Sequence, residues 1–195
     1  MWERLGVPLS GRLVRLEPLA PEHERGLAAA ADDPAVWRWM PLDASTPDAF
    51  ARWFAAALDN AGAGLERTYA TIDAATDEAL GSTRFLALAP EHLRVEIGYT
   101  WLARRAWGSG ANTEAKLLML RHAFETVGCL RVEFKTDALN ERSRAALAAL
   151  PAAFEGVHRR HMLVRGVERR DSAWYSVIVD DWPDVRAALE RRLAG

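Results

Sequence analysis

Apolar and polar residues alternate over several short stretches of the chain, and this alternation predicts strands. Val14 and Leu16 alternate with Arg15 and Glu17, a period of two that is typical of a half-buried strand. Similar runs cover residues 68–73, 82–88, 94–102, 131–137, 157–164 and 173–179. The spacers within 68–102 are short and rich in turn residues, so we expect antiparallel hairpins there.

Between these runs, apolar residues recur at helical spacing. Phe50, Trp53, Phe54 and Ala57 follow an i, i+3, i+4, i+7 pattern, directly after a hydroxyl cap and a proline within 45–48, which predicts a helix start. Further helices are expected at 21–31, 112–127, 141–150 and from Pro183. The order of these strands and helices along the chain predicts an α/β (α+β) fold, with a mixed and mostly antiparallel sheet of about seven strands flanked by helices. No repeat or linker divides the chain, so 1–195 is expected to be one domain.

Composition narrows the class of protein. The chain has 195 residues, half of them hydrophobic, and a formal net charge of −2, which leaves no broad basic field for direct DNA binding or for an acidic membrane. No apolar run reaches the roughly 20 residues that a membrane span needs, and the first residues do not resemble a secretory signal. We therefore expect a cytoplasmic protein. Cys129 is the single cysteine, so neither a disulfide framework nor a metal site is expected.

One segment carries candidate chemistry. The strand at 94–102 runs into a loop with Gly108 and Gly110, and a helix begins at Asn112. Glycines there let backbone N–H groups converge at the positive end of the helix, an arrangement that binds phosphate oxygens. Arg104 and Arg105 add guanidinium donors. A dinucleotide fingerprint would need a further glycine at Thr113, and the Walker lysine is absent.

The ordered motif Arg105-x-x-Gly108-x-Gly110-Ala111 resembles the Arg/Gln-x-x-Gly-x-Gly/Ala signature of the GCN5-related N-acetyltransferases (GNAT). Further matching segments lie at 99–102, 140–143, 154–156 and 170–176. Together they are similar to the branch of the family that acetylates ribosomal-protein N-termini, over roughly residues 9–190. Pro151 and the two alanines after it depart from the pattern common among relatives and put the local turn in doubt.

The resemblance implies a sheet splayed between 94–102 and 131–137, with acetyl-CoA in the gap. It implies that the pantetheine arm bonds to the backbone near Trp101, that the diphosphate lies on the loop and the helix start, and that Asn140 and Ser143 approach the pantetheine amide and the thioester sulfur. The full set of expected cofactor-binding residues is Trp101, Leu102, Ala103, Arg104, Arg105, Trp107, Gly108, Ser109, Gly110, Ala111, Asn112, Thr113, Asn140 and Ser143.

Amine acetylation needs a neutral amine and a path for protons. Strict alternation places Val95, Ile97, Tyr99 and Trp101 on one face of their strand. Glu96, Gly98 and Thr100 lie on the other face. A carboxylate in a central strand is costly unless it is paired or functional, so Glu96 is the candidate general base, and also an acceptor contact. The alternative is a structural ion pair with an arginine.

Ser143 is the nearest hydroxyl to the leaving sulfur and the candidate second catalytic residue, although it could equally serve as a helix-start residue. Many superfamily members carry a tyrosine in this helix, and residues 145–150 contain none. The apolar wall of the site that binds the amine acceptor is expected to include Trp37, Trp39, Met40 and Trp174. Trp53 and Trp182 are assigned to the core. Trp107 is expected to shield the cofactor. His158 and His161 are expected on opposite sides of their strand.

The sequence therefore predicts an acetyl-CoA-dependent N-acetyltransferase that acts by direct attack in a ternary complex, with a protein N-terminal α-amine as acceptor. Two alternatives stay open: acetylation of a small amine such as an antibiotic, a polyamine or an amino-acid derivative, and a non-catalytic acyl-CoA sensor or partner-binding protein. A homodimer is a further possibility that the sequence does not show.

Overall fold

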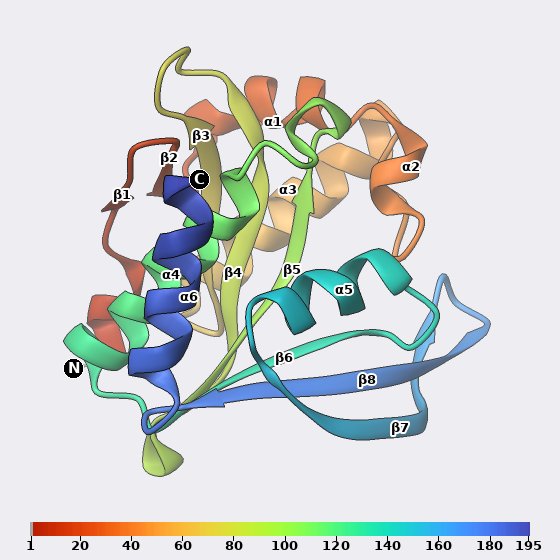
Figure 1. Ribbon diagram of the computed structural model, residues 1–195. Helices are drawn as coiled ribbons and strands as arrows, with labels where there is room; N and C mark the ends of the chain where they lie inside the picture. Colours follow the sequence, from red (N-terminus) through yellow and green to blue (C-terminus); the bar gives the residue numbers. More distant parts are fainter. Residues whose placement is uncertain (1) are drawn as a thin grey trace.

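The computed structural model describes residues 2–195, whose strands form one sheet of eight in the order β1-β2-β3-β4-β5-β6-β8-β7 (Figure 1). The strands are β1 Leu9–Ser10, β2 Val14–Pro18, β3 Arg67–Asp73, β4 Ala79–Ala89, β5 Arg94–Leu102, β6 Arg131–Asp137, β7 Ala153–Val164 and β8 Glu168–Ile178. Neighbours are antiparallel except β5 and β6. The expected mixed, mostly antiparallel sheet is confirmed. The additional strand, β1, has too few residues to show an alternation.

The α-helices are α1 Glu24–Ala30, α2 Pro34–Trp37, α3 Pro47–Gly62, α4 Ala111–Arg121, α5 Glu141–Ala149 and α6 Trp182–Ala194. The predicted cap of α3 is confirmed, because Thr46 Oγ1 accepts a hydrogen bond from the Ala49 N–H at 3.4 Å. The sequence pattern missed α2, whose short length hides any periodicity and whose N-cap is Asp33. No helix within 2–195 is long and apolar enough to cross a membrane.

The helix expected at 112–127 changes character along its length. It is α-helical to Arg121 and continues as a π-helical turn, His122–Val127, before Gly128 ends it with a φ of 78°. The left-handed φ explains why glycine stands there.

Helices cover both faces of the sheet and divide the core into two clusters (Figure 1). One cluster lies under α4 and α6 and includes Val95, Ile97 and Trp182. The other lies under α1 and α3 and is centred on Trp37, Trp53 and Trp101, whose ring centroids are 5.1–5.8 Å apart. Such aromatic pairs add about 0.5–1.5 kcal/mol each beyond area burial. The core assignments of Trp53 and Trp182 are confirmed.

The parallel pair β5–β6 is short and opens the sheet. Residues 94–96 of β5 pair with 131–133 of β6, and beyond Glu96 the two strands diverge (Figure 1). From Ile97 onward, the edge of β5 that faces β6 has no partner strand among residues 2–195. The fold therefore leaves a row of backbone donors and acceptors open in the middle of the sheet.

A β-bulge in β5 corrects the predicted alternation. Tyr99 and Thr100 together face Thr83 of β4, and Tyr99 has a φ of 52°. The extra residue reverses the faces: Ile97 packs in the cluster under α4, whereas Tyr99 and Trp101 pack in the cluster under α3. The expectation that they share one face is wrong.

Glu114 of α4 ties the start of β2 to the helix. Its buried carboxylate accepts hydrogen bonds from the backbone N–H groups of Arg12, Leu13 and Val14 at 2.9, 2.6 and 2.8 Å. We expect Glu114→Ala to lower the free energy of unfolding by about 4 kcal/mol, because three amides lose a charged acceptor. Glu114→Gln, which keeps one acceptor oxygen, should lose roughly half as much. Urea unfolding measures both, and a loss below about 1 kcal/mol for Glu114→Ala would show that water replaces the carboxylate.

Candidate functional site

A cavity of about 560 Å³ occupies the gap between β5 and β6 and extends over the N-terminal part of α4. The open edge of β5 forms one wall, and β6 with α5 forms the other. The predicted site residues that line the cavity are Trp39, Met40, Glu96, Trp101, Leu102, Trp107, Gly108, Gly110, Asn112, Thr113, Asn140 and Ser143. Residues chosen from distant parts of the sequence are thus brought to one chamber.

One end of the cavity is a cluster of backbone N–H groups. Gly108 and Gly110 have φ values of 78° and 88°, and α4 begins directly after Gly110 without a side-chain cap. Within residues 2–195, the N–H groups of Gly108, Gly110, Asn112 and Thr113 have no hydrogen-bond acceptor. Amides left free at a helix N-terminus suit phosphate oxygens, so this end of the cavity fits the diphosphate of coenzyme A.

The two arginines predicted to hold that diphosphate lie elsewhere. Arg105 Nη2 donates to the Ala79 carbonyl at 2.9 Å and to Glu78 at 3.3 Å, so it fastens the loop to the start of β4. The Arg104 side chain is 70% exposed and lies 3.8 Å from Asp33. Neither lines the cavity. A carbonyl and two carboxylates hold these side chains outside the cavity, so their role at a diphosphate stays a prediction.

Other arginines line the cavity. Arg142 lines the cavity and its guanidinium lies 3.4 Å above the Trp107 ring, which connects the loop to the start of α5. Arg192 of α6 also lines the cavity. The Trp107 indole N–H donates to the Leu102 carbonyl at 2.8 Å, so the ring is held across the end of β5.

The middle of the cavity holds the start of α5. Asn140 Oδ1 accepts a hydrogen bond from the Ser143 N–H at 3.1 Å, so Asn140 is the helix cap and Ser143 lies in the first turn. Both line the cavity. Besides Arg104 and Arg105, three further predicted cofactor residues do not line the cavity: Ala103 and Ala111 are buried, and the Ser109 hydroxyl donates within the loop to the Ala106 carbonyl.

Glu96 lies on the cavity wall at the point where β5 and β6 separate. Its side chain is 2% exposed, and Oε2 accepts a hydrogen bond from Lys135 Nζ at 2.8 Å. Oε1 is directed toward Gly98, where an added Cβ would lie 2.7 Å from it, so glycine leaves room for the carboxylate. Burial raises the pKa of Glu96 and the neighbouring Lys135 opposes this shift. The carboxylate pairs with a lysine, not with the arginine that the alternative interpretation expected.

Another part of the cavity is lined by apolar side chains and by Arg170, which is paired with Met162 across β7 and β8. Trp39, Met40, Pro41 and Met162 line it, and the backbone N–H of Arg165, in the β7–β8 turn, donates to the Pro41 carbonyl at 2.8 Å. The turn of β7–β8 therefore closes over the segment after α2.

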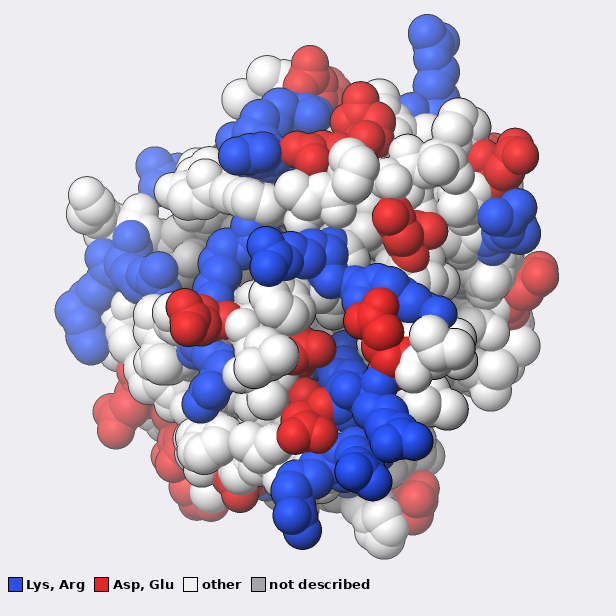
Figure 2. Space-filling model, turned by 90° about the vertical axis from the view of Figure 1, so that its right-hand side faces the viewer, with Lys and Arg blue, Asp and Glu red and all other residues white. Residues whose placement is uncertain are grey.

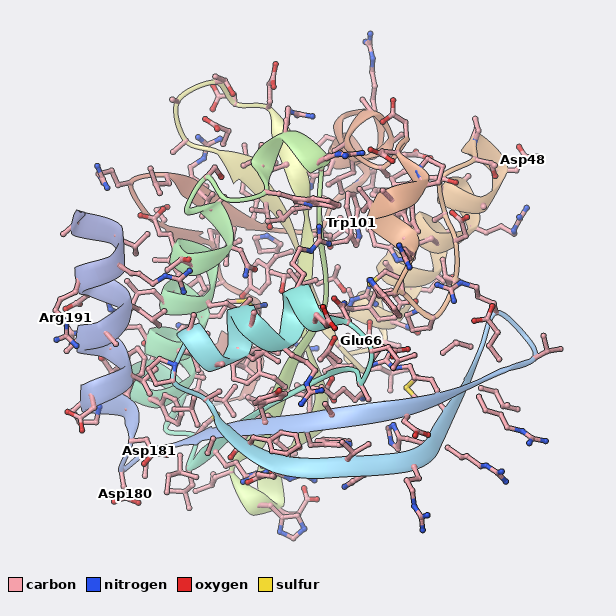
Figure 3. All side chains as sticks on the ribbon, turned by 45° about the vertical axis from the view of Figure 1, so that its right-hand side comes forward. Asp48, Glu66, Trp101, Asp180, Asp181 and Arg191 are labelled. Atoms are coloured by element: carbon pink, nitrogen blue, oxygen red, sulfur yellow. The ribbon has the colours of Figure 1, made fainter. Side chains whose placement is uncertain are left out.

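Two tryptophans predicted for this wall are placed elsewhere. Trp37 is 1% exposed and its N–H donates to the Ala31 carbonyl, so it belongs to the core. Figure 3 shows Trp101 pointing from β5 toward α2, where Trp37 meets it. Trp174 is half-buried, with Lys135 Nζ 5.4 Å from its ring, and it does not line the cavity. The assignment of Trp37 to the lining is wrong, because its ring is buried in the core.

The histidine prediction is also wrong. The rings of His158 and His161 are 5.6 Å apart and both contact Trp174. The pairing of β7 with β8 shifts register between His158 and Met162, and Arg160 has a φ of 50°. These extra residues bring the two rings to one side.

The sequence interpretation missed several charged side chains that line the cavity, namely Glu66, Lys116, Lys135, Arg142, Arg170 and Arg192. Lys116 follows Asn112 by four positions, so helical spacing could have placed it on the same face of α4. The two lysines of the chain, Lys116 and Lys135, both line this cavity.

Comparisons with known proteins agree with this geometry. The family model of the acetyltransferase (GNAT) domain matches residues 13–151. A GCN5-related N-acetyltransferase from Brucella melitensis is 30% identical, with a TM-score of 0.87 over 95% of this chain and 85% of that one. A candidate acetyltransferase from T. thermophilus is 40% identical, with a TM-score of 0.85 over 95% of this chain and 96% of that one.

Among curated proteins, a candidate ribosomal N-acetyltransferase of Bacillus subtilis (strain 168), YdaF, is 33% identical over 89 residues, which are 46% of this chain and 48% of YdaF. The chain spans about half the length of the curated relatives that it matches. The family match covers most of the chain and includes the glycine loop, the divergent strands and Glu96. The chain belongs to the GNAT acetyltransferase family.

Proposed function

We propose that the protein is an acetyl-CoA-dependent N-acetyltransferase whose acceptor is the α-amine of a protein N-terminus. The observation that carries the proposal is the continuous cavity, with four free amides at one end, the open edge of β5 along its length, and Glu96 on its wall where β5 and β6 separate. These features correspond to the three parts of such a donor, namely a diphosphate, an amide-rich arm and a reactive thioester.

Acetyl-CoA supplies an activated acetyl group. The free amides of the 108–113 segment hold the diphosphate, with Arg142 and Arg192 as the cations near it. Backbone groups of β5 beyond Ile97 bond to the pantetheine arm as a neighbouring strand would. Asn140 and Ser143 border the arm from α5.

Glu96 accepts the proton that the attacking amine releases, directly or through one water. Its Oε2 is engaged by Lys135, which leaves Oε1, beside Gly98, as the accepting atom. Burial raises the pKa of this carboxyl and brings it closer to neutrality, where a general base works best. Direct attack needs no covalent enzyme intermediate, so no nucleophilic side chain is required.

The acceptor end favours a peptide with an acidic segment. Its apolar wall accommodates a short side chain next to the amine. Figure 2 shows the face that holds α2 and the β7–β8 turn, where Lys and Arg side chains form a broken band across the middle and a second group below it. The exposed arginines of these elements include Arg38, Arg159, Arg160, Arg165 and Arg169. The name of the relative YdaF supports a ribosomal protein as the source of the N-terminus.

An acceptor panel tests the proposal. Free thiol is measured after mixing the protein and acetyl-CoA with peptides that begin with Ala or Ser, each followed by an acidic or a basic segment, with spermidine, and with an aminoglycoside. N-terminally blocked versions of the same peptides are the matched controls. We expect thiol release with free N-termini, faster for the acidic series because the face is basic, and none with the blocked peptides.

Release with spermidine or the aminoglycoside and not with peptides would establish the small-amine alternative. Absence of release with every amine, together with tight binding of coenzyme A by calorimetry, would establish the sensor alternative.

A further inference from the structure

Lys116 is a buried amine without a counter-ion. It lies on α4, is 6% exposed, and its Nζ donates to Thr100 Oγ1 at 2.7 Å and to Thr83 Oγ1 at 3.3 Å. Within residues 2–195 no carboxylate pairs with it. An uncompensated buried charge is costly, and the fold nevertheless retains a lysine here.

Lys116 lines the same cavity as Glu96 and the open edge of β5. Thr100, its nearest partner, lies in the stretch of β5 whose edge is open toward β6. Ser143, Ala146 and Leu147 of α5 line this cavity together with Lys116. An ammonium group has three donors, and the threonines use two of them. The third is free for a group that lies between α4 and α5.

We propose that Lys116 is the proton donor to the thiolate that leaves during acetyl transfer. The inference rests on the proposed function. As the amine nitrogen bonds to the acetyl carbon, the carbon–sulfur bond breaks and its electron pair stays on sulfur. The Lys116 ammonium transfers a proton to that sulfur, and Glu96 takes the proton that the amine loses. Solvent then returns a proton from Glu96 to Lys116.

The electrostatics of Lys116 suit this role. Burial lowers its pKa to about 7, so the amine is partly protonated near neutral pH and gives up its proton readily. The charged side chains that share the cavity are Glu66, Glu96, Lys135, Arg142, Arg170 and Arg192, and burial is the one cause of the shift. On α4 itself, Glu114 is engaged by the backbone of β2.

If the role of Lys116 were structural, Lys116→Met would lower Tm. The hydroxyls of Thr83 and Thr100 are 2.7 Å apart and bond to each other, so they keep a partner when the amine is removed. Methionine fills a similar volume without a charge to desolvate. We therefore expect Lys116→Met to fold with an unchanged or higher Tm.

The kinetic test compares wild type, Lys116→Met and Lys116→Arg with acetyl-CoA and the best peptide of the panel. For wild type, kcat should fall as pH rises through about 7, because the donor must be protonated. Lys116→Met should lower kcat about 100-fold at neutral pH, change the KM for acetyl-CoA only a few-fold, and lose this alkaline limb. Lys116→Arg keeps a cation that cannot release its proton, so it should not restore kcat.

A second test needs no turnover. The thiolate of bound coenzyme A is titrated by its ultraviolet absorbance in each variant. A cation beside the sulfur lowers the pKa of a thiol, and arginine stays charged throughout the titration, so the thiolate should form at lower pH in Lys116→Arg than in Lys116→Met.

Equal kcat in wild type and Lys116→Met, or identical thiol titrations in Lys116→Arg and Lys116→Met, would overturn the role of Lys116. Either result would leave the proposed function standing, since wild type would still acetylate the peptide. If wild type acetylates no amine, the proposed function fails first, and the thiol titration alone reports whether Lys116 lies beside the sulfur.

Discussion

Replacement of Gly110 by Asp is expected to weaken the binding of coenzyme A about 100-fold, or about 2.7 kcal/mol. Gly110 precedes α4 directly, and its N–H is one of the free amides at the phosphate end of the cavity. A carboxylate there would occupy the positive end of the helix and repel the diphosphate. Isothermal titration of coenzyme A into the two proteins measures the difference.

Gly110→Asn is the matched control for that experiment. Both substitutions impose a Cβ at a φ of 88°, 3.1 Å from the Leu13 side chain, so both carry the same strain. Asn tolerates this conformation about as well as Asp does but adds no charge. Binding should therefore be much stronger in Gly110→Asn than in Gly110→Asp. Equal affinities in the two variants would mean that the 108–113 segment does not hold a phosphate.

Glu96→Gln should lower kcat by about 100- to 1,000-fold while the affinity for coenzyme A stays within a few-fold of wild type. The base must be ionised, so the wild-type rate should rise with pH through the elevated pKa of Glu96, and this acid limb should be absent in Glu96→Gln. Stopped-flow measurement of thiol release at saturating acceptor, from about pH 5 to 9, gives the profile.

Lys135→Met provides the complementary evidence. The Lys135 ammonium lowers the pKa that burial raises, so its removal should move the acid limb to higher pH and leave it present. A structural ion pair would behave differently: Glu96→Gln and Lys135→Met would both lower Tm, and neither would change the shape of the pH profile. A wild-type rate in Glu96→Gln would exclude the carboxylate as the base.

The sequence predicted those parts of the site that depend on local chemistry. The glycines at 108 and 110 and the helix start after them are local signals, because a left-handed φ and an uncapped helix end each require particular residues nearby. Glu96 stood out because a charged residue is unusual in a central strand. Its lysine partner lies on another strand, and no local pattern connects the two.

The remaining differences between the predicted and the observed structure come from contacts between residues that are distant in the sequence. The bulge at Tyr99 arises from the register between β5 and β4, and an alternating pattern does not contain that information. Arg105 is drawn away from the cavity by a carbonyl and a carboxylate at the start of β4. Trp37 belongs to a helix of four residues, too short for its buried face to show in a periodicity.

The short pairing of β5 with β6 has a consequence for the lifetime of the protein. Within residues 2–195, the two halves of the sheet are joined by the short ladder of residues 94–96 with 131–133 and by the adjacent bond from the Leu130 N–H to the Leu93 carbonyl. A donor molecule that bonds to the open edge of β5 adds cross-links between these halves and binds the native state alone. By mass action, saturation at 100 times the dissociation constant adds about 2.7 kcal/mol to the stability. A bound donor would therefore protect the protein from proteolysis as well as supply its reaction.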